Sequence, residues 1–343
     1  MNISTYRCLN CEQSRWQTYQ TFWKCEACGQ NYACVKGIPR LFLDKKLGQK
    51  DKALRDYFYN GFLGSYYQYV MPFLSLPVRP LKLSWKSWVA YLLVVAALFL
   101  MLARLVNLFF VRRLEGFNLL DAAIVVVVIF VGYFLLKHRY LLSLLVLAVP
   151  VRLSLLRTKF KPEEGFAQVH ARAIDAFKGR PERLRVLDIS TGTCNSLYRH
   201  GWMQLNADYA GLDLSEIMLL QGRDLMTSRR VPMEFVIGDA AQLPFQAETF
   251  DIVLNYGAIN GMADPQLALA EMARVCKKGG LVLFLDEQLY ESASFFERAY
   301  FKSVLSSHNV IHSCPVDLLP ASLTDVRVRQ VYHFYYICTG VKQ

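Results

Sequence analysis

From residue 163 onward, short apolar runs alternate with longer segments in which apolar residues recur at helical spacing. The apolar runs predict buried strands at residues 184–189, 209–214, 234–237, 251–255 and 281–285. The longer segments predict helices at residues 163–178, from residue 195, and at 216–228, 266–277 and 295–305. Regular alternation of strand and helix is typical of a parallel sheet covered by helices on both faces. This part of the chain is therefore predicted to form a doubly wound α/β domain.

The C-terminal end departs from this alternation. Residues 326–331 and 334–341 both have the pattern of strands, and no helix separates them. Strands joined by so short a link pair antiparallel, so we predict a Rossmann-like sheet that ends in an antiparallel hairpin. The link, Tyr332-His333, lacks the glycine or asparagine of a tight turn, which leaves the strand limits there open.

Two long apolar runs precede this domain, at residues 88–110 and 119–136. Each is long enough to cross a hydrocarbon core of about 30 Å, and the link between them is short. We therefore expect a two-helix transmembrane hairpin; two buried helices of a soluble core are the alternative. A third run, residues 140–151, is shorter and contains Pro150. We expect it to lie on the membrane or to re-enter it without crossing.

The formal net charge of +11 is concentrated around these runs. Between Arg79 and Lys161 there are twelve basic and two acidic residues, a net charge of +10. The rest of the chain is nearly neutral, so the basicity fits an anionic membrane surface better than a nucleic-acid groove. Nine basic residues flank the outer ends of the hairpin, and two, Arg112 and Arg113, lie in its turn. The positive-inside rule then places both termini in the cytosol, at the inner membrane if the source is bacterial.

The cysteine content and the first residues favour a reducing compartment. No apolar run follows a basic start, so we expect no cleavable signal peptide. Nine cysteines, an odd number, do not suit a secreted disulfide framework.

Four cysteines form two CxxC pairs near the N-terminus, Cys8/Cys11 and Cys25/Cys28. Each pair can offer two thiolates to one tetrahedral Zn²⁺. The intervening WQTYQTFWK has the alternation of a short hairpin, and a unit this small needs the metal for its folding energy. We therefore predict a structural zinc ribbon at residues 1–43. Reduced thiols in an ordinary hairpin are the alternative.

Residues 44–83 are predicted to form a helical linker rich in aromatic side chains. Eight Tyr and Phe residues lie between positions 57 and 73. An amphipathic helix packed on a neighbour fits this pattern, and so does a lid over a lipophilic pocket or an interfacial anchor.

Polar residues follow the predicted strands at their carboxyl ends, where open α/β sheets bind nucleotide-like ligands. Asp188 and a turn of small residues follow the first strand and lead to a helix N-terminus. Asp213 ends the second strand, where a carboxylate can accept from both hydroxyls of a ribose. Asp239 and Ala240 follow the third and can take an adenine amino group and ring nitrogen; Asn255 closes the fourth. Singly each acid is a common cap, but in this order they indicate a nucleotide-like cofactor.

Five blocks of this region carry a family resemblance: VLDISTGTC, YAGLDLSEIML, FVIGDAAQLPF, FDIVLNYGAINGM and EMARVCKKGGLVLFLDE. Together they resemble the class I S-adenosylmethionine-dependent methyltransferases, in particular the branch that includes the ubiquinone/menaquinone-biosynthesis C-methyltransferases. The resemblance covers about residues 163–341 and implies S-adenosylmethionine as cofactor. It implies the following contacts: Asp188, Ser190 and Gly192 at the methionine end with Cys194 beside them, Asp213 at the ribose, Asp239 and Ala240 at the adenine, and Asn255 near the methyl donor. The Gly-Ile-Pro turn at residues 37–39 likewise resembles zinc ribbons that accompany methyltransferases.

The cofactor loop departs from the family's Asp-x-Gly-x-Gly-x-Gly pattern at two positions. Ser190 and Cys194 replace the outer two glycines. A Cβ can crowd a site where the backbone must approach a ligand closely. Cys194 is the more unusual of the two, and it motivates the alternative of a weakly binding or non-catalytic protein.

Candidate bases are fewer and less specific. The sulfonium is already activated, so the chemistry needs positioning, desolvation and, for some acceptors, a base. Asp286 and Glu287, just past the fifth strand, are the best placed; His200, His308 and His312 are weaker candidates. The alternatives to a catalytic role are structural: the two acids can cap a helix, and the histidines can be surface residues or hydrogen-bonded structural residues.

Taken together, the patterns divide the chain into four parts. These are a zinc ribbon (residues 1–43), a helical linker (44–83), a transmembrane hairpin with a basic interfacial segment (84–158) and a methyltransferase domain (159–343). We expect a membrane-bound methyltransferase acting at the cytosolic face on a lipophilic small molecule, either a quinone precursor or a lipid. Expected partners are membrane lipids and a protein docked on the ribbon, and the charge distribution argues against nucleic acid. The alternatives are an RNA or protein methyltransferase and a catalytically weak methyltransferase-fold subunit of a membrane complex.

Overall fold

The computed structural model describes residues 3–61, 64, 150–151, 153–155, 157, 160, 162–305 and 312–343. The chain forms two compact units. The first comprises Met1–Phe73, Lys159–Ala293 and Val310–Gln343, and the second comprises Leu74–Thr158 and Ser294–Asn309. The two sheets and the four-cysteine region belong to the first unit.

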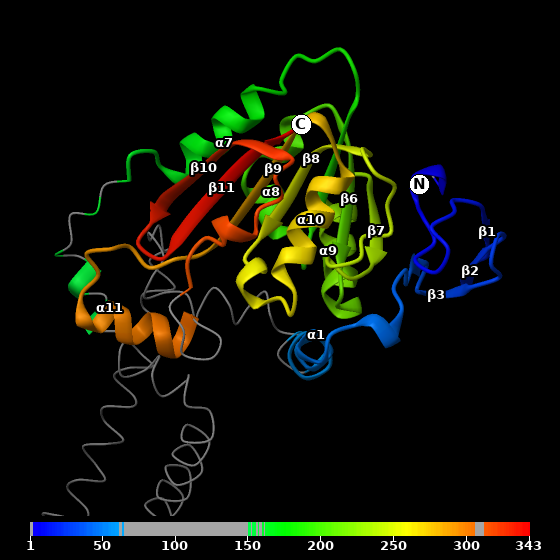
Figure 1. Ribbon diagram of the computed structural model, residues 1–343, viewed down its shortest axis with the longest axis horizontal. Coiled ribbons are helices and arrows are strands. Elements are labelled where there is room, and N and C mark those ends of the chain that lie inside the picture. The colour runs from blue at the N-terminus through cyan, green and yellow to red at the C-terminus, as the bar shows by residue number, and fades with distance from the viewer. Residues whose placement is uncertain are drawn as a thin grey trace, which may run out of the picture. The chain divides into compact units, whose positions relative to one another are not determined.

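A seven-stranded sheet organises the first unit, with strand order β10-β11-β9-β8-β5-β6-β7 (Figure 1). Its strands are β5 (Leu184–Ile189), β6 (Ala207–Asp213), β7 (Met233–Ile237), β8 (Phe250–Tyr256), β9 (Cys276–Glu287), β10 (Leu323–Tyr332) and β11 (Tyr335–Lys342). Strands β5 to β9 pair in parallel, whereas β11 runs antiparallel to both β9 and β10. The prediction of a Rossmann-like sheet with a terminal antiparallel hairpin is confirmed. β9 begins earlier than predicted, because Cys276 pairs with Phe250 as soon as the preceding helix ends.

Helices cover both faces of this sheet, as predicted. α7 (Phe166–Asp175) and α8 (Asn195–Arg199) bury apolar side chains in a core on one face, and α9 (Glu216–Ser228) and α10 (Pro265–Val275) do so on the other. Local chemistry fixes the helix starts: Ser215 Oγ accepts from Met218 N at 3.2 Å, and Asp264 Oδ1 accepts from Leu267 N at 2.9 Å. The other short helices that the structure describes in this unit are η1 (Ile3–Thr5), η2 (Asp44–Lys46), α1 (Gln49–Ala53), η3 (Leu54–Tyr59), η5 (Trp202–Gln204), η6 (Ile259–Gly261) and η9 (Val316–Leu318).

The N-terminal region folds into a second, four-stranded antiparallel sheet, which we call the cysteine ribbon (residues 3–39). Its strands are β1 (Trp16–Thr18), β2 (Phe22–Cys25), β3 (Asn31–Val35) and β4 (Ile38–Pro39). β1 and β2 form the hairpin that the alternation of WQTYQTFWK predicts, with Trp16 opposite Cys25 and Thr18 opposite Trp23.

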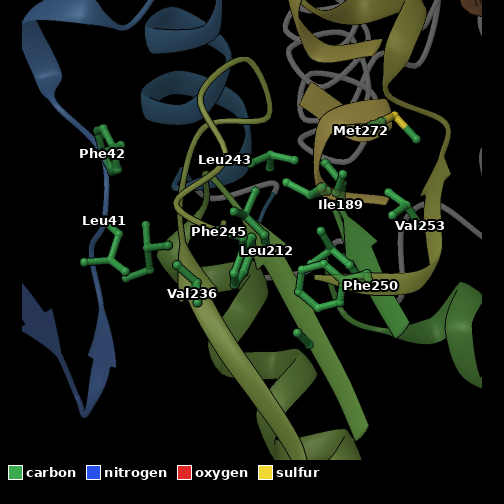
Figure 2. Close-up of a cluster of buried hydrophobic side chains, with 14 of the residues drawn as sticks. Leu41, Phe42, Ile189, Leu212, Val236, Leu243, Phe245, Phe250, Val253 and Met272 are labelled. Carbon is green, nitrogen blue, oxygen red and sulfur yellow. The ribbon is translucent and has the colours of Figure 1, made fainter. Parts of the chain in front are cut away.

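The cysteine ribbon and the large sheet share one hydrophobic core. Tyr6, Trp23 and Tyr32 of the ribbon belong to the same buried cluster as Val236 and Phe245. Figure 2 shows part of this cluster, with Leu41 beside Val236 at the edge of the sheet. Tyr6 and Phe245 are both fully buried, their ring centroids are 5.0 Å apart, and their backbones form a β-bridge. The ribbon is therefore packed as part of the domain.

In the second unit the described residues include α11 (Phe295–Tyr300), which continues as the π-helical turn η7 (Phe301–Leu305). This agrees with the helix predicted at residues 295–305. Ser294 caps α11, because its Oγ accepts from Glu297 N while the Glu297 carboxylate accepts from Ser294 N.

The described residues contradict the expectation of an integral, multi-pass membrane protein. Within the described ranges, no helix has both the length and the apolar character that a membrane span requires. The longest, α9, has 13 residues, whereas a span needs about 20 apolar residues. The predicted runs at 88–110 and 119–136 lie outside the described residues, as does most of 140–151.

Candidate functional site

Three predicted acids meet at the carboxyl edge of the large sheet. Asp188 is the penultimate residue of β5, Asp213 ends β6, and Asp239 comes two residues after β7. The three strands are neighbours in parallel register, with Asp188 opposite Gly211 and Asp213 opposite Ile237. The sheet thus brings these side chains to one edge, next to the loop between β5 and α8.

That loop has an unusual backbone in which every second residue is left-handed. The φ angles are +55° at Ser190, +53° at Gly192 and +57° at Cys194. These are the three glycine positions of the pattern expected for the loop, so the left-handed geometry is retained although two of the side chains are not glycine. An L-residue in this region costs roughly 1–2 kcal/mol. Thr191 N donates to Leu212 O at 3.0 Å and holds the loop against the end of β6.

The side chain of Cys194 is buried in the core behind the loop. Its sulfur lies 3.9 Å from Met233 Sδ and 3.4 Å from Thr191 Oγ1. Gly222 of α9 leaves room for it, since a Cβ there would come within 2.8 Å of Cys194 Sγ. Burial raises the pKa of the thiol to about 12. The Cys194 side chain therefore points toward α9, and the absence of a side chain at Gly222 avoids the expected crowding.

Asp188 is almost fully buried, at 1% exposure. Its Oδ2 accepts from Thr191 Oγ1 at 2.6 Å, while Oδ1 is buried and has no hydrogen-bond partner among the described residues. Burial raises the pKa of Asp188 to about 7; the Thr191 hydroxyl opposes this shift and the charge of Asp213 adds to it. A buried carboxylate oxygen without a donor suits a ligand that brings one, such as an ammonium group.

Asp213 is held at both carboxylate oxygens by backbone donors. Gly192 N donates to Oδ2 at 2.8 Å, and Ser215 N donates to Oδ1 at 2.8 Å. Burial raises the pKa of Asp213, and the N–H groups of Ser215 and Gly192 oppose this shift. Each carboxylate oxygen has further lone pairs, so this side chain can still accept from a diol.

Asp239, Ala240 and Asn255 complete the predicted set. Asp239 is partly buried and accepts from Ala241 N at 2.9 Å, and burial raises its pKa. Ala240 packs against the core on the α9/α10 face. Asn255 is fully buried: its Nδ2 donates to Ile189 O at 3.0 Å, and its Oδ1 has no partner among the described residues. Asn255 therefore ties β8 to the start of the cofactor loop.

A buried aromatic and imidazole cluster lies beside Asp188, and the sequence did not predict it. Tyr256 Oη accepts from Trp202 Nε1 at 2.6 Å and lies 2.9 Å from His170 Nε2. His170 Nδ1 is 2.9 Å from the carbonyl of Phe166, which can only accept, so Nδ1 carries the proton and Nε2 accepts from the Tyr256 hydroxyl. Burial lowers the pKa of His170, which keeps this tautomer neutral. The helical spacing of Phe166 and His170 was the available signal.

His200, one of the candidate bases, belongs to this cluster. Its ring stands 4.6 Å from Phe166, 4.8 Å from His170 and 5.0 Å from Tyr256, measured between centroids. Burial lowers the pKa of His200 to about 3, and His170 adds to the shift. Tyr256 and Asp188 lie on adjacent strands. Burial raises the pKa of Tyr256 well above its usual value, the hydrogen bond from Trp202 opposes this shift, and the charge of Asp188 adds to it.

The other candidate bases serve the backbone or remain protonated. Asp286 is 1% exposed and accepts from Asn260 N at 2.7 Å and from Glu287 N at 2.9 Å, as a cap does. Burial raises the pKa of Glu287 well above its usual range, and the neighbouring Asp286 adds to this. Among the described residues no hydrogen bond joins this pair to His200. His308 lies outside the described residues, and His312 borders that gap.

The four predicted metal ligands converge in the cysteine ribbon. The sulfurs of Cys8, Cys11, Cys25 and Cys28 all lie within 4.8 Å of one another. Two of the sulfur pairs, Cys8–Cys28 and Cys11–Cys25, are 3.6 Å apart, close to the edge of about 3.8 Å in a tetrahedron with Zn–S bonds of about 2.3 Å. Asn10 N points at Cys8 Sγ at 3.4 Å. The donor set and its spacing fit Zn²⁺, whereas Cys34 lies outside the cluster.

Comparisons with known proteins match part of this chain to methyltransferases. A family model described as "Methyltransferase domain" matches residues 187–284. The demethylmenaquinone methyltransferase of Renibacterium salmoninarum is 37% identical over 113 residues, which cover 33% of this chain and 45% of that protein. The ubiquinone/menaquinone biosynthesis C-methyltransferase UbiE of Cereibacter sphaeroides is 32% identical over 104 residues, covering 30% and 42%. The chain spans about half the length of the curated relatives it matches.

Among solved structures, the phosphoethanolamine N-methyltransferase 2 of Haemonchus contortus in complex with S-adenosyl-L-methionine is 16% identical. The match has a TM-score of 0.40 and covers 51% of this chain and 52% of that chain. The region that the methyltransferase-domain model matches, residues 187–284, contains the three acids Asp188, Asp213 and Asp239.

Proposed function

We propose that this protein transfers a methyl group from S-adenosylmethionine to a lipophilic small molecule of the quinone-precursor class. The observation that carries the proposal is the set of three acids, Asp188, Asp213 and Asp239, at the ends of adjacent strands in a methyltransferase domain. When bound, the cofactor supplies a methyl group on an already activated sulfonium. The chain then has to bind, orient and exclude water.

In this proposal each end of the cofactor has its own residues. Asp188, with Ser190 and Gly192 of the loop, holds the methionine end. Asp188 Oδ1, which has no hydrogen-bond partner in the described part of the chain, accepts from the ammonium group of the cofactor. Asp213 accepts from the ribose hydroxyls, since its side chain is already oriented by Gly192 N and Ser215 N. Asp239 and Ala240 take the adenine. Asn255 and Cys194 support the loop from behind. Asn255 donates to Ile189 O, and the Cys194 side chain packs in the space left by Gly222.

The class of acceptor is inferred from the relatives and from the rings beside Asp188. Two of the relatives are named for methylation of menaquinone or ubiquinone precursors. Phe166, His200 and Tyr256 are half-buried rings; the His200 ring contacts both others, and Tyr256 is the last residue of β8. A planar, apolar acceptor ring can pack against such a surface, with ring pairs worth about 0.5–1.5 kcal/mol beyond area burial.

Three of the five candidate bases, Asp286, Glu287 and His200, contribute little proton transfer in this proposal. Asp286 is occupied as a cap, Glu287 stays protonated, and His200 is a weak base because burial lowers its pKa to about 3. Positioning of the acceptor and exclusion of water are therefore the main contributions of this chain.

Cofactor binding is tested by calorimetric titration with S-adenosylhomocysteine. Wild type is expected to bind, and Asp213→Ala to bind at least tenfold more weakly. Asp208→Ala is the matched control, because Asp208 is an exposed acid of the same strand that pairs with Arg183. If wild type and Asp213→Ala give the same isotherm, the assignment is wrong.

The acceptor is tested by comparing lipid and quinone extracts of cells with and without the protein. We expect a species one methyl group heavier in the quinone fraction, and its loss in cells that carry Asp213→Ala. Methyl label that passes from the cofactor into RNA or protein instead would overturn the proposed acceptor class while leaving the cofactor site intact.

A further inference from the structure

The segment that leaves the cysteine ribbon crosses the carboxyl edge of the large sheet. We call residues 40–60 the strap. At its start Arg40 forms a parallel bridge with Ile237, the last residue of β7, and Leu41 N donates to Ile237 O at 2.8 Å. At its end Asn60 Oδ1 accepts from Ser215 Oγ at 2.7 Å, two residues beyond Asp213. The strap is thus fixed at the last residue of β7 and just past the end of β6.

The middle of the strap is fixed to the loop that follows β8. Lys50 Nζ donates to Met262 O at 3.3 Å, and Asp51 Oδ1 accepts from Ala263 N at 3.1 Å. The Asp51 carboxylate is close enough to Asp239 for its charge to raise the pKa of Asp239 further, after burial. The strap therefore contacts residues that follow β6, β7 and β8, the strands that carry Asp213, Asp239 and Asn255.

The other side of the strap is attached to the four-cysteine cluster. Lys46 Nζ donates to the carbonyl of Leu9, which lies between Cys8 and Cys11, at 3.4 Å. Leu9 N donates in turn to Tyr32 Oη at 3.1 Å, and that hydroxyl is 3.4 Å from Cys8 Sγ. Movement of the Cys8–Cys11 loop would therefore be transmitted to the strap.

Buried side chains give this connection its stiffness. Leu41, Phe42, Leu43 and Leu47 of the strap are buried in the same core as Cys8 and Cys25. Figure 2 shows Leu41 and Phe42 on the segment that runs beside β7, with Leu41 next to Val236. A packed core moves as a unit, so the strap cannot shift without the ribbon.

We propose that the strap completes the cofactor site, with Asn60 and Asp51 as positioning residues, and that the metal held by the four cysteines strengthens cofactor binding through it. This deepens the proposed function and rests on it. The coupling is reciprocal: if the metal tightens cofactor binding by a given factor, the cofactor tightens metal binding by the same factor. Couplings of this kind are typically about 5-fold to 150-fold.

The first experiment titrates the full chain with S-adenosylhomocysteine before and after removal of zinc by a chelator. We expect at least fivefold weaker binding without zinc, and recovery when Zn²⁺ is added back. Near-UV circular dichroism is recorded on both samples to report the packing of the domain. Equal affinity in two folded samples overturns the coupling but leaves the proposed function standing. Absence of binding by the zinc-loaded protein overturns the proposed function itself.

The second experiment uses zinc-loaded protein only, so it holds even if the chelated protein unfolds. The rate of zinc transfer to a coloured chelator is measured with and without saturating S-adenosylhomocysteine. We expect the ligand to slow transfer at least fivefold in wild type and to lose most of this effect in Asn60→Ala, at unchanged zinc content. Lys52→Ala, an exposed position of the strap, is the matched control and should behave as wild type. Equal slowing in wild type and Asn60→Ala overturns the proposal.

Discussion

The sulfur of Cys194 occupies the space that a side chain at Gly222 would need. A Cβ built on Gly222 would stand 2.8 Å from Cys194 Sγ and 2.9 Å from Gly192 O. A residue that departs from the expected loop pattern is therefore matched by the absence of a side chain on the facing helix. The same arrangement recurs at Gly211, where a Cβ would stand 2.9 Å from Thr191 Cγ2. Two glycines, Gly211 and Gly222, therefore leave room for the side chains of the cofactor loop, Thr191 and Cys194 respectively.

Gly222→Ala should disturb the loop, because the added methyl group meets both a buried sulfur and a backbone oxygen. We expect the free energy of unfolding to fall by about 1–3 kcal/mol, as for other overpacked sites. Urea unfolding measures this. Gly261→Ala is the control, since a Cβ there meets nothing within 4 Å. A Gly222→Ala protein as stable as wild type would contradict the packing described for Cys194.

Replacement of Cys194 separates backbone strain from packing. Glycine and alanine both remove the buried sulfur, but only glycine relieves the left-handed backbone at φ +57°. Cys194→Gly should therefore be more stable than Cys194→Ala by about 1 kcal/mol. Thermal or urea unfolding of the two variants side by side decides this. The reverse order would mean that the backbone strain at this position is negligible.

Asp188 should make the stability of the ligand-free protein fall as the pH rises. Burial raises its pKa to about 7 in the folded state, while an unfolded carboxyl ionises near about 3.9. Between these values the unfolded state loses its proton first, so it binds fewer protons and is favoured as the pH increases. We expect a loss of about 1.4 kcal/mol per pH unit from about pH 4 to about pH 7. Asp188→Asn should reduce this slope, because Asp213 and Asp239, whose pKa values burial also raises, still contribute to it. Asp208→Asn should leave the slope unchanged.

The four-cysteine cluster should hold one zinc ion per chain. Metal analysis of purified protein gives the ratio, and Co²⁺ substitution gives the visible absorption of a tetrahedral thiolate site. Cys8→Ser and Cys25→Ser should lower the metal content and the thermal midpoint. Cys34→Ser should keep the metal, because Cys34 is outside the cluster. One metal ion bound equally by wild type and Cys8→Ser would exclude this site.

Tyr256→Phe should destabilise the aromatic and imidazole cluster. The change removes the acceptor of Trp202 Nε1–H and the donor to His170 Nε2. Buried groups left without partners cost about 1–3 kcal/mol each, so we expect a loss of about 2 kcal/mol or more in unfolding by urea. Tyr19→Phe, at a position 51% exposed, serves as the control. An unchanged unfolding midpoint would show that water replaces the lost hydroxyl.

Local patterns were enough to predict the repeating part of the fold. β5 and α9 have the predicted limits, because β5 is a short, mainly apolar run that stops at a turn of small residues and α9 follows the cap residue Ser215. The positions of Asp188, Asp213 and Asp239 followed from the rule that parallel strands end at one edge. The predicted hairpin of β10 and β11 likewise needed only two strand patterns without a helix between them.

Relationships between distant residues were beyond the sequence. The Cys194 side chain points toward Gly222 of α9. The sequence predicts this helix, but it does not indicate which residues the helix contacts. The bond between His170 and Tyr256 joins positions 86 residues apart. The expected membrane location rested on hydropathy and on the basic residues that flank the apolar runs, and the helices of the described ranges do not bear it out.

The packing of the cysteine ribbon on the far part of the domain affects synthesis of the chain. Tyr6 donates to Glu234, 228 residues later, and Arg7 pairs with Glu271. At about 5–20 residues per second, the ribosome needs roughly 10–50 s to make the surface that covers Tyr6. During that interval the apolar face of the ribbon is exposed. Early metal capture by Cys8, Cys11, Cys25 and Cys28 would hold the ribbon in a native-like shape until its partner strands emerge.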